Sequence, residues 1–194
     1  MYKRQQHNNA IYYNDQLFGK MISQLKQKGL YKDSLIIYTS DHGQEFFEFG
    51  NFGHNTDFSV AQTCVPMLIK LPDSLKQKIT LPRIMSGNSL KALSSHIDIV
   101  PTILTLIGVK NPTDDYSNGK NIFDASYTRE KVVCSNWNNN AIITNKQIYI
   151  FSNTPDKIFS NEIRDSQTYQ ALTNVSTSSQ KVMQVIHENR RFLK

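Results

Sequence analysis

A short apolar run that ends in an acid and a histidine constrains this chain more than any other segment. Leu35-Ile36-Ile37-Tyr38 is too short for an ordinary helix and is rich in β-branched residues, so it predicts a buried strand. Thr39-Ser40-Asp41-His42-Gly43 follows at once and predicts a sharp turn at the carboxyl end of that strand. Ligands collect at this edge of open α/β sheets. The segment therefore predicts an α/β fold that presents polar groups at a ligand-binding edge.

The segments on both sides of this strand fit an α/β unit. Apolar residues recur at helical spacing from about Asn9 to Lys28, which predicts an amphipathic helix. Val65–Leu71 predicts the next strand, and His96–Ile107 predicts a later helix. The intervening stretch from Gln44 to Ser59 is expected to be a loop, and functional residues are concentrated on such loops.

The rest of the chain predicts short strands, turns and a final helix. Short strands are expected at Val132–Cys134, Ala141–Thr144 and Gln147–Phe151, a hairpin turn at Asn145-Lys146, turn chemistry over Asn111–Asp124, and a helix over Ser178–Leu193.

Composition excludes some classes of protein. Hydrophobic residues make up 39% of the chain and charged residues 20%, which is typical of a globular domain. No apolar run approaches the ~20 residues that span a bilayer. The net charge of +6 is dispersed and forms no basic stripe interleaved with aromatic residues, which argues against a nucleic-acid partner. It fits an anionic substrate, an anionic membrane surface or an ordinary solvated surface.

Two further features of the sequence concern its cysteines and its start. Cys64 and Cys134 have the spacing of neither a zinc cluster nor a disulfide framework, so two small buried side chains are expected, with one bridge as the alternative. Residues 1–5, Met-Tyr-Lys-Arg-Gln, resemble the translation of a sequencing adaptor. We therefore expect residues 1–5 to be non-native and residues 6–194 to carry the fold.

Asp41 and His42 are candidate metal ligands. A carboxylate and an imidazole suit zinc, manganese or a similar divalent ion, and at a turn both side chains can reach one ion. Gly43 would let the backbone turn tightly behind them. The alternative is that Asp41 caps the turn and His42 is a loop histidine with a backbone partner.

His54 is the candidate catalytic and substrate-binding residue of the following loop. A neutral imidazole can bind a metal, and a protonated one can bind an oxyanion or protonate a leaving group. Glu45 and Glu48 can orient a histidine, although solvated loop carboxylates are the simpler interpretation. Asp98 lies near a helix start together with His96, where a structural role is expected from the helix dipole.

Five phenylalanines lie in or beside the same loop. They can line an acyl or lipid surface, although packing within the loop is the simpler interpretation; they are Phe46, Phe47, Phe49, Phe52 and Phe58. The chain contains no nucleophile elbow, glycine-rich phosphate loop or Cys-His pair. The residues thus provide half of a metal site and no evident nucleophile.

The order of these segments resembles the sulfatase-like branch of the alkaline phosphatase superfamily. The resemblance covers about Ile11 to Gly108. Its segments are the helix over 13–29, Leu35–Gly43 with its Ser-Asp-His-Gly step, Gly53-His54-Asn55, Val65–Ile69 and His96–Leu104. Within that branch, Asn111–Asp124 and Ser135–Asn138 look like segments of the inner-membrane sulfatase-like proteins of Gram-negative bacteria, of the lipopolysaccharide-regulating type.

The resemblance implies a fold, a site and a location. The fold is the C-terminal part of an α/β/α sandwich with a mixed sheet and a small C-terminal β-hairpin region. Asp41 and His42 bind a divalent metal ion (zinc, manganese, magnesium or calcium), and His54 contacts a phosphate or sulfate group. The nucleophile and a transmembrane domain precede the chain, so this fragment is expected to be inactive alone, and the domain faces the periplasm.

Two functions are compatible with the resemblance. The first is a metal-dependent hydrolase or transferase that acts on a phosphate or sulfate ester, with an anionic ester or a lipid head group as its partner. The second is a non-catalytic regulator of envelope lipid homeostasis that binds a lipid or a protein.

Overall fold

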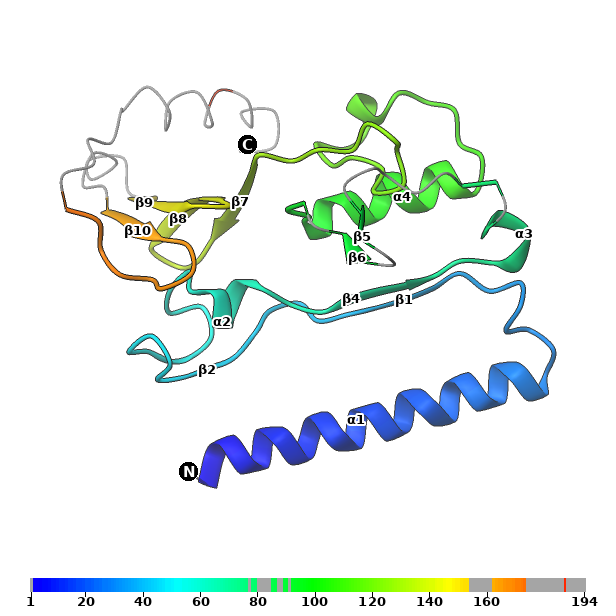
Figure 1. Cartoon of the computed structure of the whole chain (residues 1–194), viewed down its shortest axis with the longest axis horizontal. Coiled ribbons are helices and arrows are strands. Elements are labelled where there is room, and N and C mark those ends of the chain that lie inside the picture. The colour runs from blue at the N-terminus through cyan, green and yellow to red at the C-terminus, as the bar shows by residue number, and fades with distance from the viewer. Residues whose placement is uncertain are drawn as a thin grey trace. The chain divides into compact units, whose positions relative to one another are not determined.

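The chain contains two compact units, each with helices and strands. The computed structural model describes residues 2–76, 78–79, 85–86, 89–90, 92–153, 162–173 and 187 of the 194. The first unit comprises residues 1–41 and 65–79, and the second comprises residues 42–64 and 80–194. Both units combine helices with sheets, which confirms the expected mixed α/β fold (Figure 1).

A long helix opens the first unit. Helix α1 spans Tyr2–Gln27, so the predicted helix is confirmed and begins earlier than expected. Gly29 follows with a φ of 71° and ends the helix, because a residue without a Cβ adopts this left-handed conformation without strain. None of the described residues of α1 is buried, although the ring centroid of Phe18 lies 4.7 Å from that of Tyr38 on the adjacent strand.

The predicted strands of the first unit pair with each other. Strand β1 spans Ile36–Thr39 and runs antiparallel to β4, Met67–Lys70; helix α3 follows at Asp73–Lys76 (Figure 1). The Lys70 ammonium contacts the Tyr31 carbonyl oxygen, donates to the Ser34 carbonyl at 3.0 Å, and lies 4.4 Å from the centroid of the Tyr31 ring. This one cation therefore holds the turn that leads from α1 into β1.

An antiparallel sheet forms the core of the second unit. Its strand order is β10-β9-β8-β7, with β7 at Lys131–Ser135, β8 at Asn139–Thr144, β9 at Gln147–Ser152 and β10 at Glu162–Asp165. The three predicted strands and the hairpin at Asn145-Lys146 are confirmed, and β10 was not predicted. Alternate residues pack on opposite faces. One face carries Ile142, Tyr149, Phe151 and Ile163, and the other carries Ala141, Ile148 and Ile150 with Phe58 and Tyr169.

The predicted helix after residue 95 consists of two parts. A 3₁₀ turn, η1, spans His96–Asp98, and helix α4 spans Ile99–Leu106. The structural role expected for Asp98 is confirmed, but the cause is a buried ion pair rather than the helix dipole. Its fully buried carboxylate pairs with Arg129, whose Nε donates at 3.2 Å, and accepts from the hydroxyl of Tyr127 at 2.9 Å.

Short elements complete the described residues. They are β2 at Glu45–Phe46, β3 at Phe52–Gly53, α2 at Val60–Thr63, β5 at Met85–Ser86, β6 at Ser89–Leu90 and η2 at Thr113–Asp115. The helix predicted over 178–193 lies outside the described residues, apart from His187. Within those residues, no helix combines the length and hydropathy needed to cross a membrane.

The cysteine prediction is partly wrong. Cys64 and Cys134 are free thiols, so the single bridge is absent, but Cys64 is exposed rather than buried. Cys134 belongs to β7 and packs against the core of that sheet, and burial raises its pKa to about 11 because desolvation disfavours the thiolate. Neither cysteine therefore contributes to a disulfide framework.

Candidate functional site

The turn after β1 is held by a close approach between two backbones. The Gly43 N–H donates to the Gln62 carbonyl at 2.9 Å, and a Cβ placed on Gly43 would lie 2.1 Å from the Ala61 carbonyl oxygen. A side chain at this position would therefore collide with the backbone of α2. The sequence predicted a glycine for a tight turn, and the structure gives close packing of the chain as the reason.

Two of the three predicted site residues lie against each other. The rings of His42 and His54 stack with their centroids 4.1 Å apart and an interplanar angle of 19°. His42 immediately follows Asp41, and His54 follows β3. The fold therefore brings an imidazole from the loop onto the Asp-His turn. His42 is partly buried and His54 is exposed, so the pair lies at the surface of the second unit.

Each histidine is oriented through its Nδ1 atom. In His42, Nδ1 lies 2.9 Å from the carbonyl oxygen of Gly43, and in His54 it lies 3.1 Å from Oε1 of Gln44. Because a carbonyl or amide oxygen only accepts, Nδ1 is the donor in both rings, and the lone pair of each neutral ring is on Nε2. This arrangement fits a metal ligand, since ligating histidines usually donate through their other nitrogen to an oxygen.

Asp41 is the third predicted residue, and it ends the first of the two segments that form the first unit. It is exposed, and its Oδ1 lies 3.4 Å from the Ser40 hydroxyl oxygen. Within the described residues, no group of three or more His, Cys, Asp and Glu side chains gathers in a metal-binding arrangement. The assignment of Asp41 and His42 as metal ligands therefore stays a prediction.

Glu45 organises the loop that carries His54. The sequence favoured a solvated carboxylate, and this is wrong, because Glu45 is 0% exposed. Its Oε1 accepts from the backbone N–H groups of Phe49 and Asn51 at 3.1 and 2.9 Å. Its Oε2 accepts from the Ser59 hydroxyl at 2.5 Å and the Gln62 amide at 2.9 Å. All four donors are neutral, so the carboxylate is satisfied by hydrogen bonds alone.

These hydrogen bonds change the pKa of Glu45. Burial by itself raises the pKa, since desolvation disfavours the charged form. The hydrogen bonds from Ser59, Gln62 and the two backbone N–H groups outweigh burial and lower the pKa below its ordinary value. Glu45 is therefore an anchor of the loop, whereas the amide of Gln44, which the sequence did not single out, orients His54.

The C-terminal end of the loop, at residues 56–58, is held by Gln62 of α2 and by Tyr169, which follows β10. The Gln62 side-chain oxygen accepts from the N–H groups of Thr56 and Asp57 at 3.2 and 3.3 Å. The Tyr169 hydroxyl contacts the Asp57 carboxylate and accepts from the Phe58 N–H at 3.0 Å. Burial raises the pKa of Asp57, although the Phe58 N–H and the charge of Arg164 act in the opposite direction.

The five phenylalanines have separate environments. Phe58 is 2% exposed and belongs to the sheet core, and Phe49 packs beside it with its ring 5.9 Å from that of Tyr169. These two residues therefore pack against the core of the sheet in the second unit rather than within the loop. The other three, Phe46, Phe47 and Phe52, form a separate cluster in which Phe47 is 68% and Phe52 39% exposed.

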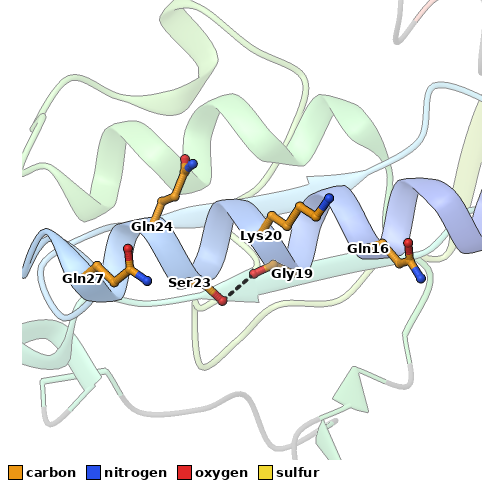
Figure 2. Close-up of a pocket in the computed structure, with 6 residues that line it drawn as sticks. All are labelled: Gln16, Gly19, Lys20, Ser23, Gln24 and Gln27. Atoms are coloured by element: carbon orange, nitrogen blue, oxygen red, sulfur yellow. Dashed lines mark hydrogen bonds between the residues drawn. The ribbon is translucent and has the colours of Figure 1, made fainter.

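The other candidate residues from the sequence, Glu48 and His96, are not part of the stacked pair of His42 and His54. Glu48 is exposed, and its carboxylate accepts from the Phe46 N–H; His96 is exposed in η1. Figure 2 shows a hollow along one side of α1, in the first unit. It is lined by Gln16, Gly19, Lys20, Ser23, Gln24 and Gln27. None of the predicted site residues lines it.

Comparisons with known proteins identify the family. Residues 2–109, more than half of the chain, match the family model described as Sulfatase. The chain is 29% identical to the N-acetylglucosamine-6-O-sulfatase of Bacteroides thetaiotaomicron over 100 residues, 52% of this chain and 16% of that protein. It is also 29% identical to the low-salt glycan biosynthesis sulfotransferase of Haloferax volcanii over 105 residues, 54% of this chain and 24% of that protein.

Solved structures share the fold. One of them, a protein in complex with its substrate D-glucosamine-2-N,6-O-disulfate, superimposes with a TM-score of 0.63 at 18% identity. The superposition covers 91% of this chain and 38% of that protein. The chain thus spans only a minor part of the length of its relatives. From the family model and these relatives together, the chain belongs to the sulfatase family of the alkaline phosphatase superfamily.

Proposed function

We propose that the complete protein is a metal-dependent hydrolase or transferase that acts on a sulfate or phosphate ester. The observation that carries the proposal is the stacking of His54 on His42, the residue that follows Asp41. Family membership supports chemistry on a sulfate or phosphate ester. Because the chain is similar to both a sulfatase and a sulfotransferase, the proposal includes transfer of the anionic group to water and to an alcohol.

Asp41 and His42 are the proposed metal ligands. The Gly43 carbonyl oxygen orients the His42 ring through Nδ1, as is usual for a histidine that binds a metal through its other nitrogen. A bound divalent ion supplies Lewis-acid stabilisation of negative charge on the ester oxygens. Carboxylate and imidazole donors are compatible with zinc, manganese, magnesium or calcium, and metal analysis of the protein will select among them.

His54 is proposed to bind the sulfate or phosphate group. Gln44 fixes its Nδ1–H, so Nε2 is the atom through which the ring acts on a substrate. In its protonated form the ring donates a hydrogen bond to an anionic oxygen, and the same proton can pass to a leaving group. Because His54 lies at the surface, a solvent-borne ester can reach it.

The proposal is tested by metal content and turnover of the intact protein. Asp41→Ala is expected to remove bound metal and to lower hydrolysis of an aryl sulfate or aryl phosphate by at least about a hundredfold. His54→Ala is expected to lower turnover while the metal is retained. The matched controls are Asp33→Ala and His96→Ala, which change exposed residues outside the site. Equal turnover of Asp41→Ala and the unchanged protein would contradict the assignment.

The proposal extends to a location and to a second function. We place the domain on the periplasmic side of a Gram-negative inner membrane, supported by the resemblance of Asn111–Asp124 to that group. A non-catalytic role in regulating envelope lipids is the second candidate, and the exposure of Phe47 in the phenylalanine-rich loop, 68%, favours it. Normal lipopolysaccharide levels in Asp41→Ala cells, with no metal in the protein, would support the regulator. A strong lipid defect from that change alone would support the enzyme.

A further inference from the structure

The hairpin formed by β2 and β3 has one buried polar face and one aromatic face. Glu45 pairs with Gly53, and Phe46 pairs with Phe52. Side chains alternate between the two faces of a strand, so the burial of Glu45 directs Phe46 and Phe52 to the opposite face. The rings of Phe46 and Phe52 meet edge to face at 5.7 Å, and Phe47 adds a third ring 5.4 Å from Phe52.

Phe47 adopts a backbone conformation that a phenylalanine rarely takes. Its φ is +68°, in the left-handed region that favours glycine. The Phe47 N–H donates to the Asn51 carbonyl at 2.8 Å, so closure of the hairpin imposes this conformation. The ring remains 68% exposed, and little burial compensates for the strain. A strained, exposed aromatic residue is not explained by folding stability and indicates a binding role.

The aromatic face and the candidate site are parts of one hairpin. His54 directly follows β3, and Gln44, which holds His54, directly precedes β2. The buried Glu45 carboxylate fixes the connection between the strands through the N–H groups of Phe49 and Asn51. One hairpin therefore carries both the rings and the imidazole proposed to bind the anionic group.

The chemistry of the rings selects an apolar occupant. Phenylalanine rings carry no polar atom, and a sugar site needs placed hydrogen-bond donors and acceptors as well as an apolar face. We propose that Phe47 and Phe52 bind the alkyl chain of the ester whose anionic group is bound at His54. The inference rests on the proposed function, and it distinguishes this chain from a relative whose substrate is a sulfated glucosamine.

The test measures binding of an alkyl sulfate series to the intact protein by calorimetry, below the micelle concentration of each compound. Affinity is expected to rise from methyl to hexyl to decyl sulfate, by up to about fourfold for each methylene group that the rings cover. In Phe47→Gly/Phe52→Ser the dependence on chain length is lost, whereas the affinity for methyl sulfate is unchanged. In His54→Ala the affinity for methyl sulfate falls and the dependence on chain length persists.

The two proposals fail in different ways. If His54→Ala leaves methyl sulfate binding and turnover unchanged, the proposed function is wrong. The proposed hydrocarbon site is wrong if the affinity of the unchanged protein does not rise with alkyl chain length. It is also wrong if Phe47→Gly/Phe52→Ser retains the dependence of affinity on chain length. Trp137→Ser, which removes an exposed ring from the turn between β7 and β8, is the matched control and is expected to keep the slope. A loss of slope in this control would indicate non-specific detergent binding and overturn the proposal.

Two further measurements separate binding from other roles of the rings. The melting temperature of Phe47→Gly is expected to equal or exceed that of the unchanged protein, because glycine relieves the strain at a positive φ. A clear decrease would show that the ring stabilises the fold and would overturn the inference. Reduced sedimentation of the double variant with phosphatidylglycerol vesicles, together with an unchanged alkyl sulfate series, would assign the rings to a membrane surface instead.

Discussion

Two fully buried carboxylates in the second unit, Glu45 and Asp98, are stabilised in different ways. Asp98 has a cationic partner, Arg129, and its other donors are the Tyr127 hydroxyl and backbone N–H groups. Glu45 has neutral donors only. The negative charge of Asp98 is thus neutralised by the adjacent guanidinium of Arg129, whereas that of Glu45 is stabilised only by hydrogen bonds from neutral groups.

The two carboxylates also connect different parts of the chain. Asp98 accepts from the N–H of Lys120 at 2.7 Å and pairs with Arg129, so it ties the start of α4 to segments that follow it in the sequence. Glu45 binds donors within its own loop and in α2. The comparison shows that an ion pair supports the scaffold, while a network of neutral donors shapes the loop that carries His54.

Removal of the Arg129 cation that pairs with Asp98 should have the largest effect on stability. Arg129→Met leaves a buried carboxylate without its counter-charge and is expected to lower the free energy of unfolding by about 3–5 kcal/mol. Urea denaturation of the intact protein measures this change through the midpoint. Lys76→Met, which breaks the exposed pair with Asp73, is the matched control and should leave the midpoint unchanged. Equal midpoints for Arg129→Met and the control would show that the ion pair is not what stabilises the scaffold.

The Glu45 network should respond less strongly and should depend on pH. Glu45→Gln places an amide among four donors and is expected to cost about 2–3 kcal/mol near pH 7. Because hydrogen bonds lower the pKa of Glu45, its contribution is complete above the ordinary value of 4.5 and is lost as pH falls through the lower folded value. Denaturation midpoints of the two proteins should therefore converge in acid. A constant difference down to pH 3 would contradict a charged Glu45.

Loss of a single donor to Asp98 should have a smaller effect. Tyr127→Phe removes the hydroxyl that donates to Asp98 and is expected to cost about 1 kcal/mol. Burial raises the pKa of Tyr127 from 10.0 to about 12, so the wild-type hydroxyl stabilises the fold below pH 10 and loses that contribution as pH rises towards 12. Thermal melts between pH 8 and 11 should show a shallower alkaline decline for the variant.

Asp57 should give the smallest effect, with the opposite dependence on pH from that of Glu45. Because burial raises its pKa, folding is favoured when Asp57 is protonated, and this contribution is lost as pH rises through the folded value. Asp57→Asn removes this titration and keeps an oxygen that can accept from the Phe58 N–H. Relative to the variant, the wild type should gain stability as pH falls through the raised folded pKa towards the ordinary value of 3.8. A parallel pair of pH profiles would contradict a raised pKa.

Local patterns predicted the parts of the site that depend on neighbours in the chain. The apolar run before Asp41 identified β1, and the spacing of apolar residues identified α1 and the strands of the second sheet. The stack of His42 on His54 was not predictable in this way, because it depends on how the loop closes. The burial of Glu45 was missed because its neighbours in the sequence resemble those of the exposed Glu48.

Partners that are far apart in sequence were the hardest to foresee. Asp98 was expected to act through the helix start, but its counter-charge Arg129 belongs to a separate segment that no local pattern connects to it. Likewise, nothing in the loop sequence identifies Gln44 as the residue that orients His54, because amide side chains are common in turns. Residue types therefore indicated the chemistry of the site, and tertiary packing determined which side chains support it.

The contact of Tyr169 with the histidine loop has a consequence for the order in which the protein matures. The Tyr169 hydroxyl reaches the Asp57 carboxylate and the Phe58 N–H, yet Tyr169 is synthesised long after both. Contacts of such large sequence separation form late, because a long stretch of chain must be ordered before they are made. The segment that presents His54 therefore reaches its final shape only when the C-terminal region has emerged from the ribosome, and a chain truncated before Tyr169 would carry an unfinished site.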